Sequence, residues 1–370
     1  MIKFSCEKVF LQNAIAVTSR AVAQKSSIPA LEGLLIHADQ QLTISGYNMQ
    51  TGIRTNVFAN VVEGGDIVLN ARLFGDIIRR MPDDMITFTA DEKMMVHVSC
   101  GDADFDILGL SAADYPDLPE VEDEYAVSMQ QKVLRSMIEE VAFAVSTNES
   151  RPVHTGALFE IADMSLSMVA VDGFRLAFRR EKLEKLEGGA FSFVCPGSAL
   201  SEVKSICGDT EDLVTVTLGK RHILFEIGDT QLICRRLEGE FLDYKNAIPR
   251  KNPIQIVAET KALIESIDRV SVVISDKLKS PVRCLFDVDR VYLSARTGNG
   301  EAKDICPISG DGQQLEIGFN NRYLMDALRY APADKVHLQL NTGISPCIIT
   351  PVEGGDEFLY MVLPVRLKAQ

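Results

Sequence analysis

The fold is decided by residues 2–48, which read IKFSCEKVFLQNAIAVTSRAVAQKSSIPALEGLLIHADQQLTISGYN. A short run of alternating hydrophobicity is followed by about 16 residues with helical periodicity. A polar turn containing Pro29 comes next, and two further alternating runs complete the stretch. The pattern therefore predicts a strand, a helix and an antiparallel strand pair, in that order.

The same order of elements occurs twice more, in residues 125–172 and 254–296, with Pro152 and Pro281 in the matching turns. Each repeat continues with a second unit of the same kind, in which a strand leads into a short helix and then into strands. These second units cover residues 64–90, 189–218 and 312–340. In the first of them, helical spacing predicts a core-facing side for Leu73, Ile77, Ile78 and Met81.

The repeats predict three domains of an α+β class, each a doubled strand–helix–strands unit. We expect the domains to cover residues 1–120, 126–248 and 249–370. An acidic linker with a proline, DLPEVEDEYA, separates the first two, and the segment 248–253 separates the last two. A solenoid is the alternative, but these repeats are too long and too few for a solenoid array.

Charge is distributed unevenly along the chain. The 370 residues include 38 Lys and Arg against 52 Asp and Glu, a net charge of −14, which excludes a uniformly basic nucleic-acid binder. The six predicted helices with their turns nevertheless sum to +5, so the remainder carries −19. Two interpretations stay open: the helices have an ordinary solvated basic face, or they face the phosphates of a nucleic acid.

Several functional classes lack their sequence signals. No apolar run is long enough to span a membrane, and the N-terminal residues do not resemble a signal peptide. The eight cysteines are scattered without a C-x-x-C pair, so we expect buried thiols in a reducing cytoplasm. Nucleophile-elbow and phosphate-loop motifs are missing, and the histidines lack metal-ligand spacing, which favours a binding protein without cofactor or metal. The alternative functions are a hydrolase or transferase that uses scattered carboxylates, and a scaffold protein that binds partners without encircling DNA.

Local motifs add a resemblance that covers essentially the whole chain. The chain resembles the bacterial sliding clamp, the beta subunit of DNA polymerase III. The matching segments, in chain order, are Leu108–Pro116, with the sequence LGLSAADYP, Val171–Ala177 (VDGFRLA), Phe241–Pro249 (FLDYKNAIP) and Tyr360–Leu367 (YMVLPVRL).

The resemblance implies three clamp domains per chain and a head-to-tail homodimeric ring of six domains. Helices would line a central channel and antiparallel sheets would form the outer wall. Such a ring encircles duplex DNA without reading its sequence, and it is a non-catalytic processivity factor. The implied partners are a clamp loader, DNA polymerases and other proteins that carry clamp-binding peptides.

The resemblance also assigns residues to the channel and to the ring interface. Channel candidates are Arg20, Lys25, Arg72, Arg79, Arg80, Lys132, Lys204 and Arg322. At the interface, Phe105 and Ile107 of one chain would face Val272 and Val273 of the other. An ordinary core position is the alternative for these four apolar residues.

A groove between the second and third domains would capture partner peptides through apolar pockets for Leu or Phe anchors. Its implied residues are His154, Val171, Gly173, Phe174, Arg175, Leu176, Leu242, Ala247, Pro346, Met361, Val362, Leu363, Pro364, Val365 and Arg366. Family members often have proline at position 242, a polar ring at 174, and Leu or Tyr at 154. We therefore expect a groove with a different partner preference.

Overall fold

The structure is a computed structural model that describes residues 1–122, 125–274, 280–353 and 357–367. These residues form two compact units. The first unit contains residues 1–134, 184–189 and 201–236, and the second contains residues 135–183, 190–200 and 237–370. Two helices begin in one unit and end in the other, namely α3 (Gln131–Ala142) and α4 (Gly197–Ile206).

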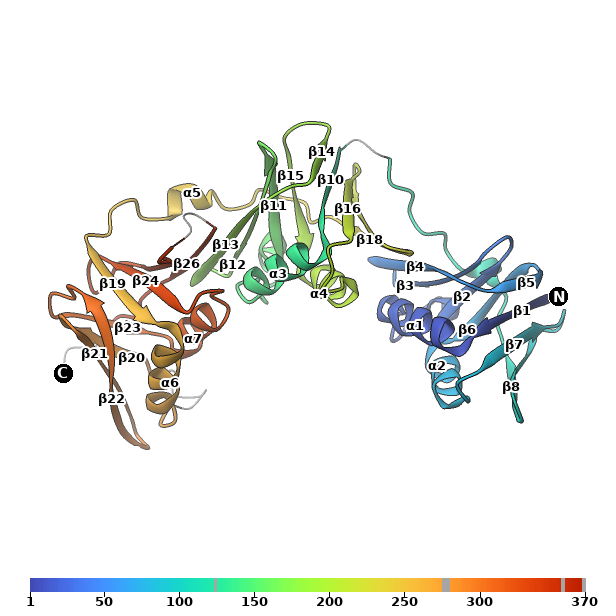
Figure 1. Cartoon of the computed structure of the whole chain (residues 1–370), viewed down its shortest axis with the longest axis horizontal. Helices are drawn as coiled ribbons and strands as arrows, with labels where there is room; N and C mark the ends of the chain where they lie inside the picture. Colours follow the sequence, from blue (N-terminus) through green and yellow to red (C-terminus); the bar gives the residue numbers. More distant parts are fainter. Residues whose placement is uncertain (123–124, 275–279, 354–356, 368–370) are drawn as a thin grey trace. The chain divides into compact units, whose positions relative to one another are not determined.

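The first unit contains two antiparallel sheets (Figure 1). The five-stranded sheet has the order β5 (Asn60–Glu63), β1 (Ile2–Glu7), β7 (Met85–Ala90), β8 (Met95–Cys100) and β9 (Ala103–Leu108). The nine-stranded sheet has the order β14 (Lys185–Glu187), β10 (Tyr125–Gln130), β16 (Leu213–Leu218), β17 (His222–Ile227), β18 (Thr230–Arg235), β4 (Thr51–Val57), β3 (Leu42–Tyr47), β2 (Gly33–Ala38) and β6 (Gly65–Asn70). Helices α1 (Lys8–Thr18) and α2 (Ala71–Arg80) pack side by side in this unit.

The second unit contains one twelve-stranded antiparallel sheet, with α6 (Thr260–Ser271) packed against α7 (Asn321–Arg329). A short helix, α5 (Tyr244–Ala247), lies in the segment that precedes β19. The strand order is β15 (Phe191–Pro196), β11 (Gly156–Ala162), β12 (Ser165–Val171), β13 (Arg175–Lys182), β26 (Phe358–Val362), β25 (Cys347–Pro351), β24 (Lys335–Leu340), β19 (Ile254–Glu259), β22 (Gly300–Gly310), β21 (Arg290–Thr297), β20 (Val282–Phe286) and β23 (Leu315–Phe319).

The predicted α+β class is confirmed, and each of the six predicted helices occurs in its expected segment. The first helix of each repeat is shorter than the predicted length, with 11 or 12 residues. In α1, the Thr18 hydroxyl donates to the carbonyl of Ala14, and the chain then tightens into a 3-10 turn over Ser19–Ala21. Val22 is extended, which ends the helical segment. Most of the predicted turn before Pro281, residues 275–279, lies outside the described residues.

One side of α2 differs from the prediction. Leu73 is 49% exposed, and Phe74 is fully buried in its place. Phe74, Ile77, Ile78 and Met81 follow the i, i+3, i+4, i+7 spacing, and all four are buried. The prediction for Leu73 was therefore wrong, because the buried side of the first helical turn is formed by Ala71 and Phe74.

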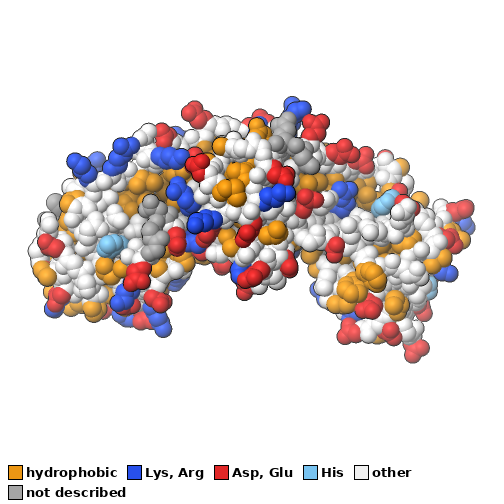
Figure 2. All heavy atoms as spheres, turned by 45° about the horizontal axis from the view of Figure 1, so that its top comes forward, with side chains coloured by type: hydrophobic (Ala, Val, Ile, Leu, Met, Phe, Trp, Pro, Cys, Tyr) orange, Lys and Arg blue, Asp and Glu red, His pale blue; other side chains and the backbone are white. Residues whose placement is uncertain are grey.

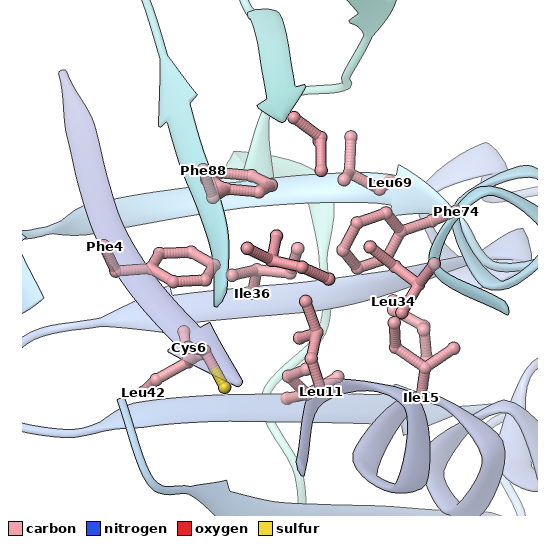
Figure 3. Close-up of a cluster of buried hydrophobic side chains, with 14 of the residues drawn as sticks. Phe4, Cys6, Leu11, Ile15, Leu34, Ile36, Leu42, Leu69, Phe74 and Phe88 are labelled. Atoms are coloured by element: carbon pink, nitrogen blue, oxygen red, sulfur yellow. The ribbon is translucent and has the colours of Figure 1, made fainter. Parts of the chain in front are cut away.

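The core of the first repeat lies between its helices and strands. Phe4 and Phe88 stack with ring centroids 4.5 Å apart, and Phe74 meets Phe88 edge to face at 6.2 Å (Figure 3). Leu11 and Ile15 reach the same cluster from α1. The buried side chains of β1 and β7 thus pack against the buried side chains of α1 and α2 in one apolar layer.

All eight cysteines lie among the described residues and are buried thiols. In the described part of the chain, no helix has the length and apolar character that crossing a membrane requires. The described residues also include no group of three or more His, Cys, Asp or Glu side chains placed to hold a metal ion.

Candidate functional site

An apolar cluster marks the place where β13 pairs with β26. Leu176 on β13 is opposite Met361 on β26, and both side chains are buried. The buried members of the cluster are Val169, Val171, Leu176, Phe178, Tyr244, Ile348 and Met361. The partly buried members are Leu158, Phe241, Ile248, Leu359 and Leu363. We call these twelve residues the groove cluster.

A tight turn between β12 and β13 lies beside this cluster. The Asp172 Oδ1 atom accepts hydrogen bonds from the backbone amides of Phe174 and Arg175, at 2.9 and 3.0 Å. Gly173 has a φ of +89°, a backbone conformation that favours glycine. The turn leaves Phe174 57% exposed, so its ring is available to a partner.

The first repeat contains a turn of the same kind. Asn48 Oδ1 accepts hydrogen bonds from the amides of Gln50 and Thr51, at 3.0 and 2.8 Å. Met49 has a positive φ of 70°, as Gly173 has in the second repeat. The internal repeat therefore extends to individual hydrogen bonds.

The segment with α5 is anchored to the sheet by Tyr244. Its hydroxyl donates a 2.7 Å hydrogen bond to Glu160 on β11, and Lys245 pairs with the same carboxylate at 2.9 Å. Burial and the bond to Glu160 raise the pKa of Tyr244. Burial alone would raise the pKa of Glu160, but its bonds to Lys245 and Tyr244 outweigh burial and lower that pKa. The ionised carboxylate therefore holds α5 against the groove cluster.

A pocket of about 470 Å³ is formed by two segments, residues 151–154, most of which form a 3-10 turn, and residues 238–243. His154 meets the Phe241 ring edge to face, with centroids 5.5 Å apart, and Leu242 also lines the pocket. Burial lowers the pKa of His154, and the neighbouring Arg151 lowers it further. The imidazole is therefore neutral at neutral pH and presents an uncharged wall.

The channel candidates lie on helices and on their flanking turns. Arg72, Arg79 and Arg80 share one exposed face of α2, and the latter two pair with Asp76 of that helix. Arg20 pairs with Glu202 at 2.9 Å, and Lys132 pairs with Glu211 at 2.6 Å.

Among the described residues, no ion-pair partner lies within 4.0 Å of Lys25, Arg72, Lys204 or Arg322. On the face that Figure 2 draws, basic and acidic side chains alternate without a continuous basic field.

Two of the interface candidates lie on a strand at a sheet edge, and the other two follow α6. The strand β9 is the last strand of the five-stranded sheet, where Phe105 is 39% exposed and Ile107 packs partly against the core. Val272 follows α6 and is 83% exposed, whereas Val273 is half-buried. The carbonyl of Val273 accepts a 2.9 Å bond from the Thr297 hydroxyl at the end of β21. The alternative that these residues are ordinary core residues therefore holds in part for Ile107, and it does not hold for Val272.

Three family models of the DNA polymerase III beta subunit match consecutive parts of the chain. The N-terminal domain matches residues 2–119, the central domain matches 128–243 and the C-terminal domain matches 245–366. The chain belongs to the DNA polymerase III beta subunit family.

Known sliding clamps match nearly the whole chain. It is 33% identical to the beta sliding clamp of Synechocystis, covering 99% of the chain and 100% of the relative. It is 31% identical to the beta sliding clamp of Halalkalibacterium halodurans, covering 97% of both. The crystal structure of the Bacillus subtilis DNA polymerase sliding clamp is 26% identical, with a TM-score of 0.94, and the match covers 99% of this chain and 100% of that one. The three-domain clamp fold is thus shown.

Nine of the fifteen residues that the resemblance assigns to a peptide groove fall into three groups. Val171, Leu176, Met361 and Leu363 belong to the groove cluster, and His154 and Leu242 line the adjoining pocket. Gly173, Phe174 and Arg175 form the turn. Val362 is fully buried outside the cluster, on the face of β26 opposite Met361. Among the rest, Ala247 and Arg366 are exposed, and Pro346, Pro364 and Val365 are half-buried.

Sequence reasoning missed several residues of the groove cluster and two residues that contact the neighbouring turn. Phe241 and Tyr244 lie in a segment that carried the resemblance, and their aromatic side chains were the available signal. Phe178 and Ile348 belong to alternating strands, but no local pattern indicates which strand edges meet. The same holds for Tyr323 and Asp326 on α7, whose contacts with the turn come from distant positions in the sequence.

Proposed function

We propose that this protein is a DNA sliding clamp, a non-catalytic processivity factor that encircles duplex DNA and tethers DNA polymerases. The observation that carries the proposal is the match of all three clamp domains, in order, over residues 2–366. The proposed domain limits are residues 1–120, 126–248 and 249–370.

The groove cluster and the 470 Å³ pocket form the proposed docking site for partner peptides. Partly buried Leu363 and Phe241, together with exposed Leu242 and Phe174, offer apolar surface to Leu or Phe anchors. Apolar pockets flanked by a few polar groups are typical of peptide-binding sites. Polymerases and a clamp loader are the proposed partner proteins that carry these peptides.

The basic face of α2 and the other channel candidates are the proposed DNA contacts. Four of the eight side chains have acidic neighbours, so each contributes a weak attraction. Diffuse attraction to phosphates positions a duplex without reading its bases. It also leaves the protein free to move along the DNA.

The ring is proposed to close through β9 of one chain and, in another chain, through Val272 and the part of β22 that precedes Ile308, which pairs with β21 on one side. A head-to-tail contact of two different edges closes when the rotation between chains permits. An unpaired edge strand is a template for pairing with a second chain. Exposed Phe105, Leu108 and Ile305 provide apolar area for this contact.

The proposal includes action in the cytoplasm. Its support is that all eight cysteines are buried thiols, which is typical of proteins from reducing compartments.

Primer extension tests the proposed function. The polymerase of the same genome would copy primed circular single-stranded DNA with the clamp loader and ATP, with and without this protein. We expect much longer products per binding event when the protein is present. Products of equal length, under conditions where the loader hydrolyses ATP, would contradict a processivity function.

A further inference from the structure

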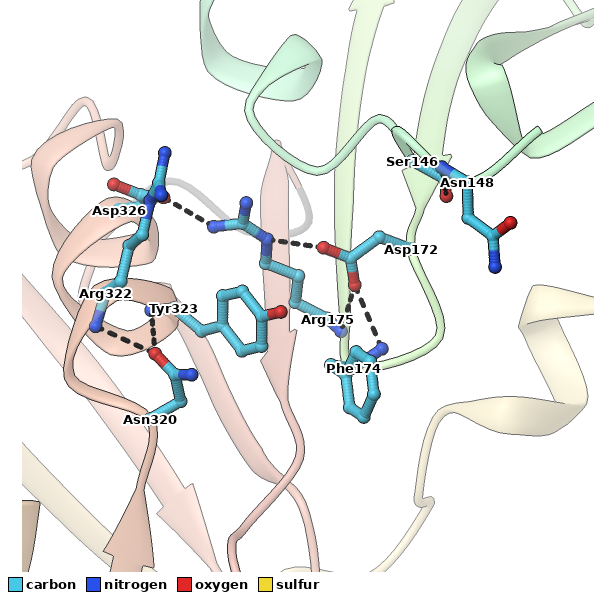
Figure 4. A network of polar contacts seen from close by, with 9 residues as sticks. All are labelled: Ser146, Asn148, Asp172, Phe174, Arg175, Asn320, Arg322, Tyr323 and Asp326. Carbon is cyan, nitrogen blue, oxygen red and sulfur yellow. Dashed lines mark hydrogen bonds and ion pairs between the residues drawn. The ribbon is translucent and has the colours of Figure 1, made fainter. Parts of the chain in front are cut away.

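The side chain of Arg175 forms hydrogen bonds with other side chains of the same protein. It is 10% exposed, although the residue lies in the turn beside the groove cluster. Its Nε atom donates to Asp172 Oδ2 at 2.9 Å, and its Nη1 atom donates to Asp326 Oδ2 at 2.6 Å (Figure 4). One buried cation is thus shared between the turn and α7.

Two aromatic rings complete the surroundings of the guanidinium group. Its central carbon lies 4.6 Å from the ring centroid of Tyr323 and 5.4 Å from that of Phe143. Flat contacts of this kind suit the delocalised charge of arginine and not the compact ammonium group of lysine. The geometry therefore specifies Arg at this position.

The same arrangement supports the exposed wall of the groove. The Phe174 ring stacks on Tyr323, with centroids 5.8 Å apart and an interplanar angle of 22°. Asn320 caps α7 by accepting from the amides of Arg322 and Tyr323, at 3.0 and 3.3 Å. Asp326 and Tyr323 are one helical turn apart, so the helix presents both to the turn (Figure 4).

Asp172 has a double role in this network. Its Oδ1 atom fixes the turn through two amides, and its Oδ2 atom binds Arg175. Charge-assisted hydrogen bonds in a partly buried setting are stronger than neutral ones. Removal of one partner also leaves a poorly solvated charge, which is costly.

We infer that Arg175 is a positioning residue, which clasps the Asp172–Arg175 turn to α7 and thereby sets the position of Phe174. In this role Arg175 determines the shape of the groove rather than contacting a partner peptide through its charge. The clasp also ties the groove to the helix that carries Arg322. This inference rests on the proposed peptide-binding function.

The test uses Asp326, which is outside the predicted groove. The probe is a fluorescein-labelled synthetic peptide with Leu and Phe anchors, taken from the polymerase of the same genome and titrated by fluorescence anisotropy. We expect Asp326→Ala to weaken binding about tenfold, because the loss of a hydrogen bond to a charged group releases the turn. Asp268→Ala is the matched control, because it removes an equal charge on α6, where Asp268 lies 3.8 Å from Arg329.

A conservative variant and a spectroscopic reporter separate positioning from general destabilisation. Asp326→Glu should restore most of the affinity. Since the chain contains no tryptophan, Phe174→Trp provides a single reporter. Its emission should shift to longer wavelength when Asp326→Ala is added, at a temperature where circular dichroism shows both variants folded.

The outcomes distinguish the inference from the function on which it rests. Wild-type protein that fails to bind the peptide contradicts the proposed function. Wild-type binding with an unchanged affinity in Asp326→Ala overturns the clasp. Equal losses in Asp326→Ala and Asp268→Ala overturn it as well, because they indicate an effect of charge alone.

Discussion

The backbone amide of Leu363 donates a 2.9 Å hydrogen bond to the carbonyl of Phe174. The bond joins the segment after β26 to the turn before β13, two places 189 residues apart in the chain. It places the Leu363 side chain at the rim of the groove cluster, partly exposed and in contact with buried apolar groups. The C-terminal segment therefore contributes both backbone and side chain to the proposed peptide site.

Leu363→Asp should weaken binding of the polymerase peptide by more than about tenfold, because a carboxylate replaces an apolar side chain in the groove. Leu363→Met is the matched control, since it keeps a similar apolar volume and should bind within about threefold of wild type. Anisotropy titration measures both. Equal affinities of the Asp and Met variants would remove Leu363 from the site.

Peptide binding should weaken as the pH falls from 7.5 to 5.5. The pKa of His154 is lowered by burial and by Arg151, so the neutral form predominates at pH 7.5. A bound peptide buries the ring further and favours the neutral form, so protonation at acid pH opposes binding. His154→Gln should flatten the profile of Kd against pH.

His222→Gln is the control for this pH profile. The pKa of His222 is also lowered, by burial and by Arg235 and Arg221, but the residue is outside the groove cluster and its adjoining pocket. The control should retain the wild-type profile. A profile that persists in His154→Gln would assign the pH dependence to another group.

Arg79→Glu combined with Arg80→Glu should reduce the amount of protein loaded onto DNA several-fold, because the exposed face of α2 becomes acidic. The deficit should be larger at low salt, where attraction of exposed charges is less screened. Lys185→Glu combined with Arg290→Glu makes the same change in net charge on strands and should load normally. A wild-type yield for the α2 variant at low salt would contradict the channel assignment.

Phe105→Asp should convert the dimer into a monomer, because it buries a charge at the proposed β9 edge. Native mass spectrometry should give twice 40.8 kDa for the wild type and 40.8 kDa for the variant. Val288→Asp, at another exposed apolar position, is the control and should remain dimeric. A dimeric Phe105→Asp variant would place the interface elsewhere.

Local periodicity was sufficient to predict the six longer helices, because helical patterns repeat over a few residues, and it also predicts strands. The alternation of Val336, Leu338 and Leu340, for example, predicts β24, and all three are buried. The prediction for α2 was wrong although the signal was present. Leu73 and Phe74 are both apolar, but only Phe74 has the i, i+3, i+4, i+7 spacing to the later buried residues of the helix.

Contacts between residues far apart in the chain could not be predicted from local sequence patterns. Arg175 meets Asp326 across 151 positions, and no spacing rule connects a turn to a helix so far along the chain. The pairing of β13 with β26, and of β4 with β18, likewise depends on which sheet edges remain free after each repeat has formed. The resemblance supplied predicted groove residues that local patterns did not, but it did not indicate the contact of Arg175 with α7.

Retention on circular and linear DNA tests the central claim most directly. The protein is loaded onto a nicked circular plasmid with a clamp loader and ATP, isolated by gel filtration, and the plasmid is then cut once with a restriction enzyme. A ring that encircles DNA is predicted to remain on the intact circle and to be lost from the linear product by sliding off its ends. Equal retention on both forms would contradict topological binding.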